Sequence, residues 1–155
     1  MTPRAPALAL LGTLLALPAL AQGKSSSPDA SPWDGEWVGT YLCGQGETGL
    51  TLRLRSESGG AVAGLFHFWP LASNPGAAEG CFLMAGRPSG GKLPELRLVA
   101  GRWLLQPPDY VTVDLAAMLD ADGQLVGTVG GPGCTGVLLR RAASPVPLPT
   151  PCAPR

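Results

Sequence analysis

The segment Leu50-Thr51-Leu52-Arg53-Leu54-Arg55 decides the fold class, because leucine alternates with a polar side chain along its whole length. Alternation with a period of two places every leucine on one face of a β-strand and every polar side chain on the other. We therefore predict a strand that is buried on one face and in contact with water on the other.

Seven other short segments share this pattern, at residues 36–43, 61–69, 81–87, 95–99, 111–119, 124–129 and 134–140. The stretches between them, such as Ser58-Gly59-Gly60 and residues 120–123, are rich in residues that favour tight turns. Residues 115–119 could be helical but are too few for a stable helix. The sequence predicts an all-β fold, a single small antiparallel meander of about eight strands.

Such a meander hides its edges either by closing into an up-and-down barrel or by folding into a two-sheet sandwich. We favour the closed barrel, because eight strands enclose an interior just wide enough for side chains or one small ligand. Glycines inside the strands suit the bends of a small barrel, and they are Gly39, Gly64, Gly86, Gly127 and Gly136. The sandwich is the second choice.

Both ends of the 155-residue chain differ from this strand-forming part. Residues 1–21 combine one basic residue, an apolar run and Ala-Leu-Ala, which is typical of a secretory signal peptide. The composition of residues 22–32 predicts a flexible leader, and that of residues 142–155 predicts an extended proline-rich tail. We therefore place a single β domain at residues 33–141 and expect an exported product, periplasmic or extracellular, without membrane insertion after cleavage of the signal.

The charges balance, with 11 Lys+Arg against 11 Asp+Glu and no basic cluster. Nucleic-acid binding depends on Lys and Arg contacts to phosphates, so this partner class is excluded. The single histidine, His67, follows Phe66 and precedes Phe68, so alternation predicts a half-exposed structural residue that faces away from both rings. Because no nucleophile motif, carboxylate pair or metal-ligand spacing is present, we expect no catalysis, metal or cofactor.

Four cysteines in an exported chain favour disulfides and allow three pairings. In a closed meander the first and last strands are neighbours, so Cys43 can reach Cys134. Cys81 and Cys152 then remain and would attach the tail to the strand that carries Cys81.

Aromatic side chains at strand ends and in loops are the candidates for a binding site. Trp69, Trp103 and Tyr110 could line the barrel mouth and hold a glycan, a peptide or an apolar ligand, with Gln45 and Thr48 adding polar contacts. Core packing is the alternative role for the aromatics, and turn chemistry is the alternative for Gln45 and Thr48.

We therefore expect a non-enzymatic binding module for an unknown small ligand or protein. The alternative is an inhibitor or partner-binding protein of secreted hydrolases, which would use an exposed loop such as residues 73–80 or the proline-rich tail.

Residues 37–50 match the pattern W-x-G-x-Y-x-C-x-Q-G-x-T-G-L. This opening resembles an uncharacterised family of small exported bacterial β domains, and the resemblance continues through Asn74-Pro75 to Gly133-Cys134. It implies an exported β domain without an assigned activity. Cys81 and Cys152 depart from the family pattern, and so does Pro108-Asp109. The resemblance therefore gives no expectation for the loop before Tyr110. A weaker similarity links the opening to avidin-like and lipocalin-like barrels.

Overall fold

The computed structural model of the protein describes Met1 and residues 31–153. The described residues therefore leave out all but Met1 of the predicted signal peptide at residues 1–21, most of the predicted leader at residues 22–32 and the last two residues of the tail.

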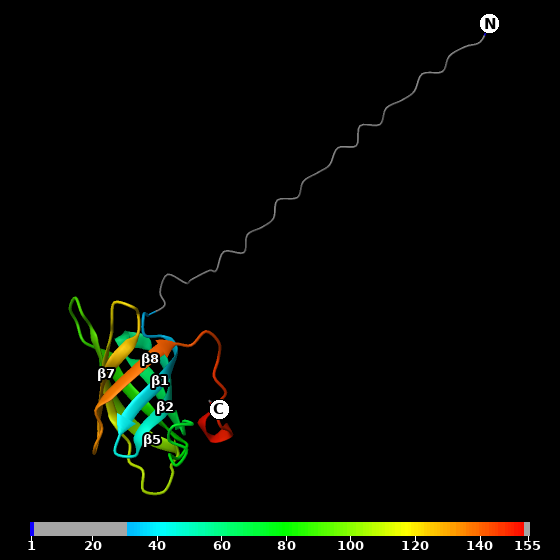
Figure 1. Ribbon diagram of the computed structural model, residues 1–155. Coiled ribbons are helices and arrows are strands. Elements are labelled where there is room, and N and C mark those ends of the chain that lie inside the picture. Colours follow the sequence, from blue (N-terminus) through cyan, green and yellow to red (C-terminus); the bar gives the residue numbers. More distant parts are fainter. Residues whose placement is uncertain (2–30, 154–155) are drawn as a thin grey trace.

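Eight antiparallel strands follow one another in chain order around a closed barrel, and β1 pairs with β8 to complete it (Figure 1). The strands are β1 Gly35–Cys43, β2 Gly46–Ser56, β3 Val62–Trp69, β4 Gly80–Pro88, β5 Glu95–Leu105, β6 Asp114–Leu119, β7 Leu125–Gly130 and β8 Gly136–Arg141. Two short 3₁₀ turns, η1 Ser58–Gly60 and η2 Thr150–Cys152, complete the regular structure of the described residues. The prediction of an all-β meander closed into a barrel is confirmed.

The fifth strand is longer than the sequence indicates, because it continues to Leu105 instead of ending at Val99. Phe82 pairs with Trp103 and Met84 with Ala100, so β5 fits one more residue than β4 into this interval. Such a bulge interrupts the period of two, and the alternation therefore conceals the second half of β5. The sixth and eighth strands begin later than expected, because residues 111–113 and 134–135 belong to loops.

Inward-pointing side chains fill most of the barrel. Leu50, Leu52 and Leu54 of β2 are at most 5% exposed, as their alternation with polar residues predicts. The prediction that the other face contacts water is wrong at Thr51, which is fully buried and accepts a hydrogen bond from Trp69, and holds at Arg55, which is exposed. Trp33 closes one end, where it is 2% exposed and its carbonyl oxygen accepts a hydrogen bond from Trp37 Nε1 at 2.8 Å. Any hollow in the barrel must therefore lie towards the other end.

Close contact between neighbouring strands explains two of the strand glycines. A Cβ atom at Gly86 would overlap the carbonyl oxygen of Arg97, and one at Gly39 would overlap the carbonyl oxygen of Leu138. The absence of a side chain at these positions lets the strands approach each other and curve, which a small closed barrel requires.

The proline-rich tail returns along the outside of the barrel (Figure 1). Glu36 forms an ion pair with Arg53, with 2.8 Å between Oε1 and Nε, and its second carboxylate oxygen accepts the backbone N–H of Val146 at 2.8 Å. Further along, a disulfide joins Cys152 to Cys81 of β4. Leu65, Cys81 and Cys152 are the buried members of a second apolar cluster, which Leu148 and side chains of β4 and β5 complete.

The predicted half-exposure of His67 is wrong. His67 does face away from the core, but it is only 3% exposed, and its register partners on the outer face, Thr51 and Cys81, are fully buried. Its Nε2 lies 2.9 Å from Glu79 Oε1. The sequence indicates which face of the strand carries His67, whereas the cover arises from the loop that carries Glu79 and the tail attached at Cys81.

Candidate functional site

The end of the barrel opposite Trp33 contains a cavity of about 330 Å³. We call this end the mouth, which comprises the loops at residues 44–45, 70–79, 106–113 and 131–135. Aromatic rings form much of the cavity wall, and they belong to Tyr41, Phe66, Phe68, Phe82 and Tyr110. A volume of this size, enclosed mainly by apolar side chains with a few polar groups, is typical of a small-molecule site.

The aromatic rings hold one another in place. Phe66 stacks on Phe82 with ring centroids 4.8 Å apart, and Phe68 stacks on Tyr110 at 5.4 Å. Tyr41 meets Phe66 edge to face at 5.2 Å. These contacts favour defined ring orientations, so the apolar wall is formed before any ligand arrives.

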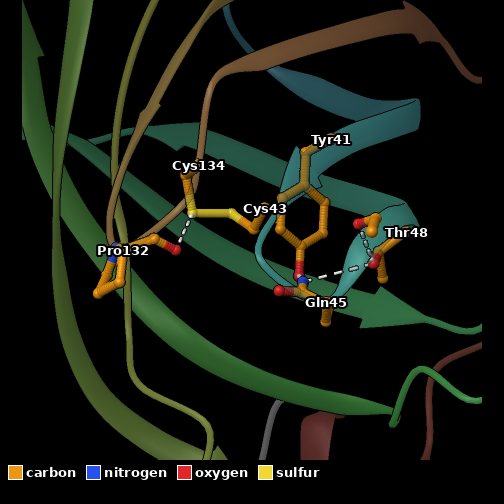
Figure 2. Close-up of a disulfide and its surroundings, with 7 residues drawn as sticks. Tyr41, Cys43, Gln45, Thr48, Pro132 and Cys134 are labelled. Atoms are coloured by element: carbon orange, nitrogen blue, oxygen red, sulfur yellow. Dashed lines mark hydrogen bonds between the residues drawn. A yellow bond between two sulfur atoms is a disulfide. The ribbon is translucent and has the colours of Figure 1, made fainter.

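A polar group of three side chains lies beside this wall, at the turn between β1 and β2 (Figure 2). Gln45 Nε2 donates hydrogen bonds to the Tyr41 hydroxyl oxygen at 2.9 Å and to Thr48 Oγ1 at 3.4 Å. The Thr48 hydroxyl in turn donates to the carbonyl oxygen of Gly46 at 3.1 Å. Burial raises the pKa of the Tyr41 phenol far above its ordinary value, and nearby Tyr110 adds to the increase, while the bonds with Thr48 and Gln45 oppose it. Tyr41 is therefore neutral at physiological pH.

The Cys43–Cys134 disulfide also lines the cavity and ties the end of β1 to the loop before β8 (Figure 2). The backbone N–H of Thr135 adds a hydrogen bond to the carbonyl oxygen of Leu42 at 2.9 Å. Both disulfides have the pairing that the closed meander leads us to expect, and they are compatible with an oxidising, exported location.

Asp109 is an exposed residue of the mouth that also lines the cavity. Its φ of 63° lies in the left-handed region, which aspartate and asparagine tolerate better than most side chains. The loop around it is anchored on both sides, because Gln106 Nε2 donates to the Tyr110 carbonyl oxygen at 3.1 Å and the Tyr110 hydroxyl accepts the N–H of Ala78 at 3.0 Å. The carboxylate is thus carried by a fixed turn.

The structure places the predicted site residues in three positions: lining the cavity, behind its wall, and on the outer face of the barrel. Gln45 and Tyr110 line the cavity. Thr48 is fully buried behind Gln45, and Trp103 packs edge to face against Phe82 with centroids 5.0 Å apart, so both support the wall without lining it.

The expectation that Trp69 lines the mouth is wrong. Its Nε1 donates to Thr51 Oγ1 at 3.2 Å, and its ring lies against Gly49, both on the outer face of β2. The physical reason is the alternation itself, because a strand that points Phe66 and Phe68 inward must point Trp69 outward.

Five further residues line the cavity and were not predicted to do so, and they are Tyr41, Phe66, Phe68, Phe82 and Asp109. The inward direction of the four aromatic residues could have been inferred from alternation in β1, β3 and β4, whereas Asp109 belongs to a loop. The existence of a cavity around them could not, because it depends on how the loops of the mouth close over the strand ends.

No family model matches the chain, and no curated protein or solved structure shows a significant match. The resemblance of residues 37–50 to a family of exported β domains stays a prediction. Within residues 31–153, no three His, Cys, Asp or Glu side chains gather to hold a metal ion, and no helix is long and apolar enough to cross a membrane.

Proposed function

We propose that the protein is an exported, non-enzymatic binding module that holds a small, largely apolar ligand in the cavity of the mouth. The observation that carries this proposal is the cavity of about 330 Å³ with five aromatic rings in its wall. Burial of an apolar ligand surface against aromatic side chains provides most of the affinity in sites of this kind, while a few polar groups fix orientation.

The chemistry of the lining supports binding over catalysis. Tyr41 is held in its neutral form, and Cys43 and Cys134 are joined to each other and offer no thiolate. His67 lies on the outer face, away from the cavity. Asp109 is the single carboxylate among the lining residues, whereas acid–base hydrolysis of glycosides uses two.

The alternative function, binding to a secreted hydrolase, is favoured by the loop at residues 70–79. Asn74 Nδ2 donates to the carbonyl oxygens of Gln45 at 2.8 Å and Glu47 at 3.0 Å, which fixes this loop to the first hairpin. Ser73 and Pro75 flank Asn74 and are exposed. A rigid, exposed loop loses little entropy on docking to a partner.

Titration of the folded protein with benzyl alcohol, followed by NMR chemical shifts, tests the proposed cavity. We expect saturable shifts at Tyr110 and Gln45. Val111→Trp places a large ring at the rim, so it should weaken binding by about tenfold or more, because it removes room for the ligand. Val99→Trp is the matched control, since Val99 is as exposed (62%) as Val111 (61%) but does not line the cavity.

Equal binding by Val111→Trp and the wild type would contradict the proposal. Saturable binding by the wild type and by Val99→Trp, together with its loss in Val111→Trp, would support it.

A further inference from the structure

The mouth has an uneven distribution of charge. Its four loops contain two carboxylates, Glu79 and Asp109, and no lysine or arginine. At the same end, Glu47 follows the first residue of β2 and Asp114 begins β6, while the exposed Arg102, three residues before the end of β5, is the one basic side chain nearby among the described residues. Asp109 is the single charged side chain among the residues that line the cavity. A ligand entering here therefore meets negative charge.

The aromatic wall has the same electrostatic preference. The face of an aromatic ring carries partial negative charge and attracts a cation that lies over it. Five rings belong to the wall, and the partly buried ring of Tyr110 follows Asp109 directly in the chain, whereas Phe66, Phe68 and Phe82 are at most 1% exposed. Within the cavity, such rings favour a cationic ligand over an anionic one.

The polar side chains at the turn between β1 and β2 add a hydrogen-bond acceptor to the cavity. Both hydrogens of the Gln45 amide nitrogen have partners, in Tyr41 and Thr48. The part of this side chain that remains for a ligand is its carbonyl oxygen, which can only accept a hydrogen bond. Gln45 and Asp109 thus both offer acceptors to the cavity, and both suit an N–H donor.

We infer that the ligand is a small organic cation, an ammonium group attached to an apolar or aromatic body. This inference rests on the proposed function and names the ligand class for the same cavity. The ammonium group lies at the rim, near the exposed carboxylate of Asp109. The apolar body lies beside the partly buried ring of Tyr110 and the side chain of Val111, above the packed layer of Phe66, Phe68 and Phe82, which are at most 1% exposed.

Three probes of nearly equal size and different charge test the inference at neutral pH: benzylammonium, benzyl alcohol and benzoate. In NMR titrations of the wild type, we expect benzylammonium to bind about threefold more tightly than benzyl alcohol and about tenfold more tightly than benzoate. Higher salt should reduce the preference for benzylammonium, since the carboxylate is exposed.

Asp109→Asn removes the charge and keeps a residue that tolerates the left-handed backbone. We expect it to lower the affinity for benzylammonium by about threefold to fivefold and to leave that for benzyl alcohol unchanged. Glu47→Gln is the matched control, because it removes one negative charge from the same end while its side chain bonds Thr40 and does not line the cavity. It should leave both affinities unchanged.

The outcomes separate this inference from the proposed function. If benzyl alcohol or benzoate binds as tightly as benzylammonium, and Val111→Trp blocks that binding, the cavity is a binding site and the cationic ligand class is wrong. If Asp109→Asn leaves benzylammonium affinity unchanged, the assigned role of the carboxylate is wrong as well. If none of the three probes binds in the millimolar range, both the ligand class and the proposed function fail.

Discussion

Tyr41 illustrates how one residue links the core to the site. Its ring packs against Phe66 inside the barrel, while its hydroxyl group accepts a hydrogen bond from Gln45 at the cavity. The hydroxyl thereby fixes the amide of Gln45, which in turn reaches Thr48. The polar end of the cavity is therefore positioned by a buried residue whose own environment disfavours charge.

The raised pKa of Tyr41 predicts a fall in stability at alkaline pH. The unfolded chain loses the phenol proton near the ordinary pKa of 10.0, whereas the folded protein retains it to higher pH. Stability from this group is thus fully present below pH 10 and declines above it, by at most about 1.4 kcal/mol per pH unit. Tyr41→Phe should reduce this alkaline decline and lower the free energy of unfolding at pH 7 by about 1 kcal/mol, because a buried hydrogen bond is lost.

Urea denaturation at pH 7, 9 and 11 checks this expectation, with Tyr110→Phe as the control. The Tyr110 ring is only partly buried, and its hydroxyl group is bonded to Ala78. An alkaline decline that is as steep in Tyr41→Phe as in the wild type would show that the buried phenol is not its source.

Among the elements, the tail at residues 142–153 is stabilised differently from the strands. A strand of this barrel has two hydrogen-bonded neighbours. The tail is held by hydrogen bonds of Val146 with Glu36 and Arg53, by a small apolar cluster and by the Cys81–Cys152 disulfide. The tail covers side chains of the outer face and does not enter the barrel. Its loss should therefore leave the cavity intact.

The two disulfides should consequently differ in their effect on stability. Their sequence separations, 91 and 71 residues, give similar chain-entropy values of about 4–5 kcal/mol each as upper limits. We expect Cys43→Ala/Cys134→Ala to lower the free energy of unfolding by most of this value, because both positions are held by the barrel. In Cys81→Ala/Cys152→Ala the tail can detach while the barrel stays folded, so we expect a loss of only about 1–2 kcal/mol.

Urea unfolding of the two double variants, with hydrogen exchange of the tail amides, distinguishes these effects. A larger loss of stability without the Cys81–Cys152 bond than without the Cys43–Cys134 bond would contradict the minor role of the tail.

Alternation in the sequence predicts the elements well wherever one face of a strand is buried and the other is wet. It fails in the second half of β5, where the bulges against β4 add residues that the pattern cannot reveal. It also fails at His67, because cover on the outer face comes from parts of the chain remote in sequence. The site was predicted only in part, because alternation does not indicate how the loops of the mouth close over the strand ends. Gln45 and Tyr110 were predicted, whereas the strand residues that line the cavity were not.

For the whole molecule, the two ends of the barrel have different roles. Trp33 and Trp37 fill one end, and the guanidinium group of Arg141 lies 4.3 Å from the centroid of the Trp37 ring. The other end carries the cavity, its aromatic wall and the carboxylate of Asp109. Side chains thus fill the barrel from the Trp33 end through its middle, and the cavity at the other end is the basis of the proposed binding function.

Intermolecular nuclear Overhauser effects between benzyl alcohol and the protein would locate the bound ligand and so show whether it occupies the cavity. We expect contacts from the ligand to the ring protons of Tyr110 and the methyl groups of Val111, which line the cavity. Contacts confined to exposed outer-face residues such as Leu42 and Leu138, with none to these cavity residues, would contradict the proposed site.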